Sequence, residues 1–232
     1  MELELERDAL VGYETVTEVT LCQEETLESI VPDACPDIAR IVDVYGQATL
    51  SGKQAREGTA QVTGMVRAVL LYQPEGAGGL RRMEVGLPFT CQAEAPGLTE
   101  AGTVLASPRL RQAEARALNP RKVLLRVDLA VDITACQPVE LPISRSVSGA
   151  EEYGVCQRQF QGEHYQLCSV QEKPFTFSEQ LRLPSGAGDL PQLLALRVQP
   201  VCGECRLIGG KLIFKGAVET DLLLQENQPL CG

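Results

Sequence analysis

The chain has 232 residues, of which 44% are hydrophobic, and its 31 acidic and 21 basic side chains give a net charge of −10. This length and composition are typical of a globular protein with one large domain or two smaller ones. The acidic balance argues against nucleic acid as a partner, because binding to phosphates depends on clustered Lys and Arg side chains.

The first ten residues, MELELERDAL, are acidic and lack both the basic and the apolar region of a signal peptide. No later stretch reaches the roughly 18 apolar residues that a membrane helix needs. We therefore expect synthesis in the cytosol without the standard secretion route, and no insertion into a membrane.

The first half of the chain predicts one short helix and two strands. PDACPDIARIV (32–42) favours a helix that begins near its aspartates. TAQVTGMVRAVLLY (59–72) alternates as a strand does, with Gly64 as a bulge or a close approach of two backbones, and MEVGLPFTC (83–91) predicts a shorter strand. The glycine-rich residues 76–79 between them predict a flexible hairpin connection rather than a nucleotide loop, because a strand follows them.

The elements that follow are also mostly strands. SPRLRQAEARAL (107–118) fits a helix that Asn119-Pro120 would end, although alternation fits part of the same stretch. KVLLRVDLAVDIT (122–134) places five aliphatic side chains on one face, which is typical of an antiparallel strand with one wet side. SRSVSGAEEY (144–153) predicts a polar linker and FTFSEQLRL (175–183) a further strand. With 4% aromatic residues and no Trp, the core is expected to be aliphatic.

An internal repeat becomes visible when the chain is shifted by 152 residues without gaps. Gly58, Gly64, Val66, Leu70, Leu71 and Gln73 then meet Gly210, Gly216, Val218, Leu222, Leu223 and Gln225. Both the glycines and the alternating strand pattern match after this shift. We therefore interpret the chain as two homologous β units. The sequence thus predicts an all-β protein of tandem antiparallel β-sandwich-like domains with one or two short helices.

We expect the first domain over residues 1–143, a linker with the strand that leads into the second unit over 144–164, and the second domain over 165–232. In the first copy the strand pattern continues to about Thr134, and the equivalent position of the second copy lies beyond residue 232. The second domain is therefore expected to be incomplete. Either the sequence is part of a longer protein, or something outside the chain completes the unit, since the unpaired edge of an incomplete sheet invites a strand from a neighbouring molecule.

Four ordered elements of the sequence resemble the SPOCS domain. They are PDACPDIARIVDV (32–44), the paired strands around GTAQVTG (58–64), LPFT (87–90) and NPRKVLLRVDLAVDI (119–133). This domain occurs in tandem in spore-coat proteins of anaerobic spore-forming Firmicutes. Pro36, Asp37 and Ile38 match its recurrent Pro-Asp-Ile element and are a candidate interaction motif, whereas the second copy has Gly188, Asp189 and Leu190 at these positions.

The resemblance implies a structural and adaptor role, because the best-known member of the family attaches a coat-forming ATPase scaffold around the developing spore. We expect a spore-coat or spore-surface protein, made in the mother-cell cytoplasm, that binds itself and other coat proteins such as that scaffold. A variant is a filament subunit in which one chain donates a strand to the next. The alternative is a small-molecule-binding or enzymatic β domain with a CxxC redox or zinc site.

Nine cysteines are many for a cytosolic protein, and the odd number leaves at least one without a partner in the chain. They are either buried reduced thiols or cross-links between chains in an oxidising place. Cys22 and Cys231, which lie near the termini, and the pair Cys202 and Cys205 are the candidates for disulfides between chains. Within a strand this pair would face opposite sides and could share a metal or a disulfide only if Gly203 supplied a bulge.

The other candidates for chemistry are few. His164 is the only histidine, which removes most catalytic zinc arrangements and leaves one candidate dyad with Cys168. The carboxylate pairs at residues 24–25 and 151–152 are sequence neighbours, which point to opposite faces of a strand. We therefore expect no catalytic residue, no cofactor, no metal and no enzymatic activity.

Overall fold

The computed structural model describes residues 4–76, 78–148, 154, 158, 163, 165–180 and 192–225. In these ranges the chain forms eight β-strands and no helix, which confirms the predicted all-β class. The strands are β1 (Glu4–Ile30), β2 (Ile38–Arg56), β3 (Thr59–Pro74), β4 (Arg81–Glu94), β5 (Thr103–Asn119), β6 (Lys122–Ser148), β7 (Gln192–Ile208) and β8 (Lys211–Gln225). Within the same ranges, no helix is long and apolar enough to cross a membrane.

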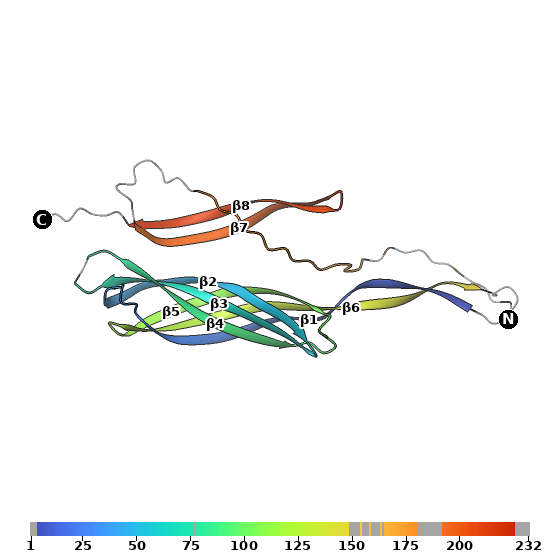
Figure 1. Cartoon of the computed structure of the whole chain (residues 1–232), viewed down its shortest axis with the longest axis horizontal. Coiled ribbons are helices and arrows are strands. Elements are labelled where there is room, and N and C mark those ends of the chain that lie inside the picture. The colour runs from blue at the N-terminus through green and yellow to red at the C-terminus, as the bar shows by residue number, and fades with distance from the viewer. Residues whose placement is uncertain are drawn as a thin grey trace.

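Two three-stranded antiparallel sheets form the body of the molecule (Figure 1). One has the strand order β1-β6-β5 and the other the order β2-β3-β4. The long strands β1 and β6 pair from Ile30 and Lys122 to Glu4 and Ser148, and their far ends continue beyond the body as a two-stranded ribbon. Strands β7 and β8 form a separate hairpin alongside the body.

Alternating side chains fill the space between the two sheets. The even-numbered positions of β3 from Ala60 to Tyr72 are buried, as are the odd-numbered positions of β6 from Val123 to Ala135. The core is mostly aliphatic, as the composition predicts, and the strands predicted over 59–72, 83–91 and 122–134 are confirmed. Because a shift by one residue would turn these apolar rows outward, their burial fixes the register of the sheets.

Both helix predictions are wrong, and for the same reason. Residues 31–37 form a turn, and β2 begins at Ile38, whose amide donates to the Pro120 carbonyl at 2.9 Å. Residues 107–118 belong to β5, which pairs with β6. A neighbouring strand is available in each case, and its ladder of hydrogen bonds and side-chain contacts outweighs a local helical preference.

Two further predictions are also wrong for the residues that the structure describes. The predicted linker begins too early, because β6 continues to Ser148, where it is paired with β1. Residues 175–180 of the strand predicted over 175–183 form no strand, and Phe175 and Phe177 stack on each other in an exposed position. No described strand pairs with residues 175–180.

The hairpin β7–β8 has the same register as the hairpin β2–β3, displaced by 152 residues. Within the part of β2 that β7 matches, from Arg40 onward, the pairing shifts at Val42 and again at Ser51. In β7 it shifts at Leu194 and Gly203, which are the equivalent positions. Since a bulge adds one unpaired residue and bends the strand, two bulges at matching places give the two hairpins the same shape.

Two equivalent glycines confirm that the hairpins share one backbone geometry. A Cβ atom on Gly64 would lie 2.4 Å from the Thr49 carbonyl oxygen, and one on Gly216 would lie 2.2 Å from the Val201 carbonyl oxygen. Real Cβ atoms do not approach an oxygen so closely, so both positions require glycine. The close approach predicted at Gly64 is therefore present in both hairpins.

Candidate functional site

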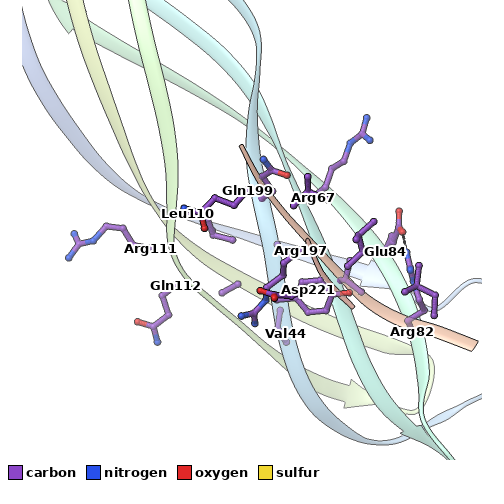
Figure 2. A pocket seen from close by; sticks show the side chains of 18 of the residues that line it. Val44, Arg67, Arg82, Glu84, Leu110, Arg111, Gln112, Arg197, Gln199 and Asp221 are labelled. Carbon is purple, nitrogen blue, oxygen red and sulfur yellow. Dashed lines mark hydrogen bonds and ion pairs between the residues drawn. The ribbon is translucent and has the colours of Figure 1, made fainter. Parts of the chain in front are cut away.

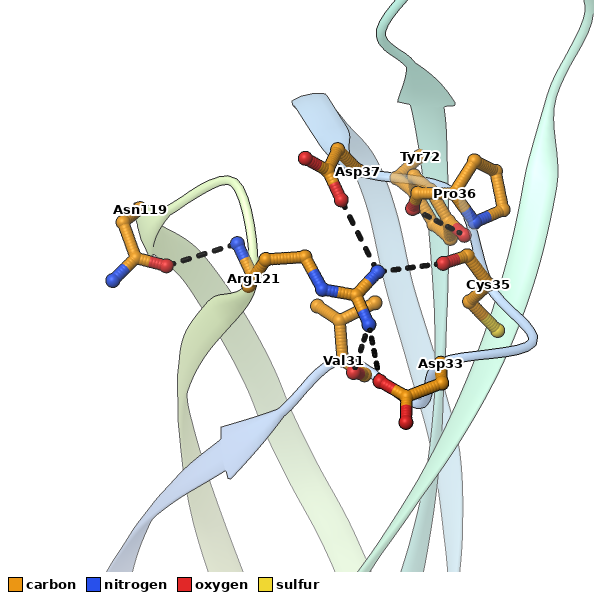
Figure 3. A network of polar contacts seen from close by, with 8 residues as sticks. All are labelled: Val31, Asp33, Cys35, Pro36, Asp37, Tyr72, Asn119 and Arg121. Carbon is orange, nitrogen blue, oxygen red and sulfur yellow. Dashed lines mark hydrogen bonds and ion pairs between the residues drawn. The ribbon is translucent and has the colours of Figure 1, made fainter.

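The turn between β1 and β2 carries the Pro-Asp-Ile motif and is organised by the side chain of Arg121 (Figure 3). One terminal nitrogen donates to the Cys35 carbonyl at 2.7 Å, and the other donates to the Val31 carbonyl at 2.9 Å. The same guanidinium pairs with the carboxylates of Asp33 and Asp37, each at 3.1 Å. A planar group with five donors can satisfy four oxygens at once, which an ammonium group cannot do in this arrangement.

The residues of the motif are engaged within the chain itself. Ile38 is buried in the core. The Asp37 carboxylate pairs with Arg121, and the backbone carbonyl of Asp37 accepts a hydrogen bond from the backbone amide of Glu75 at 2.9 Å. This geometry favours a structural role for Pro36, Asp37 and Ile38, and a role in binding another protein stays a prediction.

Tyr72 closes the same turn from the side of β3. Its hydroxyl donates to the Pro36 carbonyl at 3.3 Å. Burial, and secondarily the Cys35 thiol beside the hydroxyl, raises the pKa of Tyr72 to about 12. The hydroxyl therefore stays protonated, and remains a donor to this carbonyl, throughout the physiological pH range.

The cysteines of the described ranges are all free thiols; Cys35 is half-buried, and the others are either buried or exposed. Cys91 and Cys136 are buried, and burial together with the nearby Glu25 carboxylate raises the pKa of Cys91. The exposed thiols are Cys22, Cys168, Cys202 and Cys205. Three of the four candidates for disulfides between chains are thus accessible. Cys231 lies outside the described residues, as do Cys156, His164, residues 151–152 and residues 188–190.

Cys202 and Cys205 lie on the same face of the hairpin, contrary to the arrangement expected of a regular strand. The register shift at Gly203 puts Cys202 opposite Gly216 and Cys205 opposite Phe214. Because residues two apart on β8 share a face, the two thiols share one as well. Among the described residues, no group of three or more His, Cys, Asp and Glu side chains could hold a metal ion.

A groove of about 1000 Å³ lies between the hairpin and the body of the molecule (Figure 2). Strands β2 to β5 form one wall, and β7 and β8 form the other. Its charged lining residues are Arg67, Arg82, Arg111, Arg197, Glu84, Glu219 and Asp221. Since both signs are present in similar number, the groove favours no single class of charged ligand.

Direct contacts hold the hairpin to the body beside this groove. The Tyr45 hydroxyl donates to the Leu194 carbonyl at 3.0 Å, and the Arg197 guanidinium carbon lies 5.8 Å from the centroid of the Tyr45 ring. The side-chain oxygen of Gln225 accepts the amide of Leu80 at 2.7 Å. These hydrogen-bonded partners are 149 and 145 positions apart in the sequence, so no local pattern could have indicated the groove.

The glycine-rich connection between β3 and β4 is a turn, as the sequence predicts. Gly76 and Gly79 have φ angles of 66° and 79°, which glycine adopts without strain. β4 follows at Arg81 and pairs with β3, so no helix starts there to bind a phosphate group.

The chain matches no family model, and comparisons with curated proteins and with solved structures also give no match. Any statement about its function therefore depends on its own sequence and geometry.

Proposed function

We propose that this chain is a structural protein of the bacterial spore coat or spore surface, which acts by binding copies of itself and other coat proteins. The resemblance of four ordered elements to the SPOCS domain supports a location in the spore coat or on the spore surface. In this proposal the chain is made in the mother-cell cytoplasm and joins the coat afterwards. A coat ATPase scaffold is the partner that the resemblance favours.

The observation that carries the proposed self-association is the uncovered hairpin β7–β8. The equivalent hairpin β2–β3 is paired with β4 and packed against the sheet β1-β6-β5. By contrast, the side chains of β7 and β8 are mostly exposed, including large apolar ones. Exposed apolar patches of this kind mark surfaces that bind another protein.

The exposed thiols support a covalent version of the same assembly. Cys22, Cys202 and Cys205 are free and accessible, so each can meet a thiol of a neighbouring molecule. Each disulfide formed in this way joins two sulfur atoms and transfers two protons and two electrons to dioxygen outside the mother cell. Reduced chains inside the cell would then become cross-linked only after the coat is exposed to an oxidising medium.

The test is to fractionate spores of the producing bacterium and to follow the chain on gels with and without a reducing agent. We expect it in the coat fraction, in high-mass species that reduction converts to a band of 25.1 kDa. Negative-stain microscopy of the purified chain then separates a filament from a particle of fixed size. A chain that is absent from the coat fraction and runs as a monomer under both conditions would contradict the proposal.

A further inference from the structure

One face of the hairpin β7–β8 is mostly apolar and carries no charged side chain from Leu196 to Leu222, whereas the other face carries charged side chains interspersed with apolar ones. We call the first the apolar face. Its large side chains are between 39% and 74% exposed; they are Leu196, Val198, Leu207, Leu212, Phe214, Val218 and Leu222. The opposite face carries the charges Arg197, Glu204, Arg206, Lys211, Lys215, Glu219 and Asp221. No charged residue occupies a position of the apolar face between Leu196 and Leu222.

The apolar face corresponds to the face that is buried in the other hairpin. By the common register, Leu212, Phe214, Val218 and Leu222 of β8 are the equivalents of four β3 residues that are 0% exposed: Ala60, Val62, Val66 and Leu70. In β3 these positions pack against the sheet β1-β6-β5. The same backbone therefore has a packed face in one place and an unpacked face in the other.

The body of the molecule does not supply the missing cover. The sheet β1-β6-β5 is already packed against β2-β3-β4. The hairpin touches the body mainly near Leu194 and Gln225, at the end remote from its turn. A two-stranded hairpin that buries no face is marginally stable in water, so the exposed end requires a partner.

We propose that the apolar face of β7–β8 docks against the same face of a second copy, which forms a four-stranded sandwich about a twofold axis. This inference rests on the proposed function and specifies its contact. One isologous contact covers both apolar faces at once. Because the face is uncharged, it also allows two chains of net charge −10 to meet without opposing like charges.

The size of the face fits a reversible dimer. β8 has 15 residues, and two strands of that length cover roughly 50 Å by 10 Å, or about 500 Å² per copy and 1,000 Å² in total. Specific interfaces begin at about 1,000 Å². We therefore expect a dissociation constant in the micromolar range rather than a permanent dimer.

The docked copies would also bring their thiols together, since Cys202 and Cys205 belong to the apolar face. The reduced dimer should therefore protect these two thiols from alkylation, whereas Cys22 on β1 should remain reactive. This difference gives the docking a second, independent readout.

Sedimentation velocity of the full chain in reducing buffer, from about 1 to 100 μM, tests the docking. We expect a monomer–dimer equilibrium that Phe214→Asp shifts to monomer, with at least a tenfold rise in the dissociation constant. Ile213→Asp is the matched control, since Ile213 is the neighbouring exposed residue on the charged face and its replacement should leave the dimer intact. Leu207→Asp, with Arg206→Asp as its own control, repeats the comparison on β7.

The outcomes separate this inference from the proposed function. If the wild type associates but Phe214→Asp and Ile213→Asp behave alike, self-association stands and the apolar face is not its site. If the wild type stays monomeric over the whole range, both the twofold docking and self-association are contradicted. Alkylation by N-ethylmaleimide, followed by mass spectrometry, should slow at Cys202 and Cys205 but not at Cys22 as the concentration rises. Equal rates at all three thiols would contradict the docking.

Discussion

Arg121 shows how a residue outside a motif can determine the structure of that motif. Pro36, Asp37 and Ile38 attract attention in the sequence, yet Arg121 joins the carbonyl groups and carboxylates around them. Its hydrogen-bond partners lie 84 to 90 positions earlier in the chain. The turn between β1 and β2 therefore depends on a contact that only the folded chain makes.

Replacing Arg121 by Ala should lower the free energy of unfolding by about 2–3 kcal/mol, because two backbone carbonyls lose charged donors. Arg121→Lys should keep only part of the stability that Arg121→Ala loses, since an ammonium group lacks the planar fork that reaches both carbonyls. Urea unfolding followed by circular dichroism measures the differences.

Arg109→Ala is the matched control for Arg121. Arg109 also makes two hydrogen bonds, to the Asp132 carboxylate, but its side chain is 62% exposed compared with 35% for Arg121. Exposed pairs contribute at most about 1 kcal/mol, so this loss should be the smaller one. Equal losses for the two Ala variants would show that Arg121 does not organise the turn.

At the scale of elements, the two related hairpins show which local features the chain encodes twice. Gly64 and Gly216 each face a carbonyl oxygen of the neighbouring strand, and the bulges at Ser51 and Gly203 occupy equivalent places. One of the bulged residues is not a glycine, so the bulge is set by the pairing of the strands rather than by one residue type. The close approach, in contrast, tolerates glycine alone.

Gly64→Ala should cost about 1–3 kcal/mol or more, because its Cβ would meet the Thr49 carbonyl oxygen and also lie 2.2 Å from the Phe89 ring. Gly86→Ala on β4 is the control: its nearest contact would be Met65 Sδ at 3.4 Å, so its effect should stay below about 1 kcal/mol. Thermal and urea unfolding measure the loss of stability in each variant. A Gly86 variant as unstable as the Gly64 variant would contradict the steric argument.

On the scale of the whole molecule, the position of the hairpin on the body depends on a small number of contacts. Tyr45 contributes two of them, through its hydroxyl to the Leu194 carbonyl and through its ring to Arg197. Since the hairpin has little buried surface of its own, loss of these contacts should release it as a unit.

Tyr45→Ala should therefore increase amide hydrogen exchange in β7 and β8 by about tenfold, because a hydrogen bond and a cation–π contact of roughly 1.4 kcal/mol together are lost. Exchange in β3 and β6, which lie in the core, should not change. Tyr165→Ala is the control, since Tyr165 is 93% exposed. If both variants gave the same exchange pattern, Tyr45 would have no part in docking the hairpin.

The sequence by itself determined the strands over 59–72, 83–91 and 122–134 and the relation between the two hairpins. Alternation of apolar and polar residues is a property of consecutive positions, so the strands over 59–72 and 122–134 are readable without any partner. The shift of 152 residues likewise located the second hairpin and its required glycine.

Only the tertiary structure decided how these elements meet. Residues 107–118 are a strand because β6 lies beside them, and Cys202 and Cys205 share a face because the pairing with β8 places a bulge at Gly203. Partners that are distant in the sequence fix such features, through hydrogen bonds and packing that no local pattern encodes. The apolar face is one such feature. The bulge at Gly203 interrupts the alternation of β7, so only the pairing with β8 shows which side chains of β7 lie on that face.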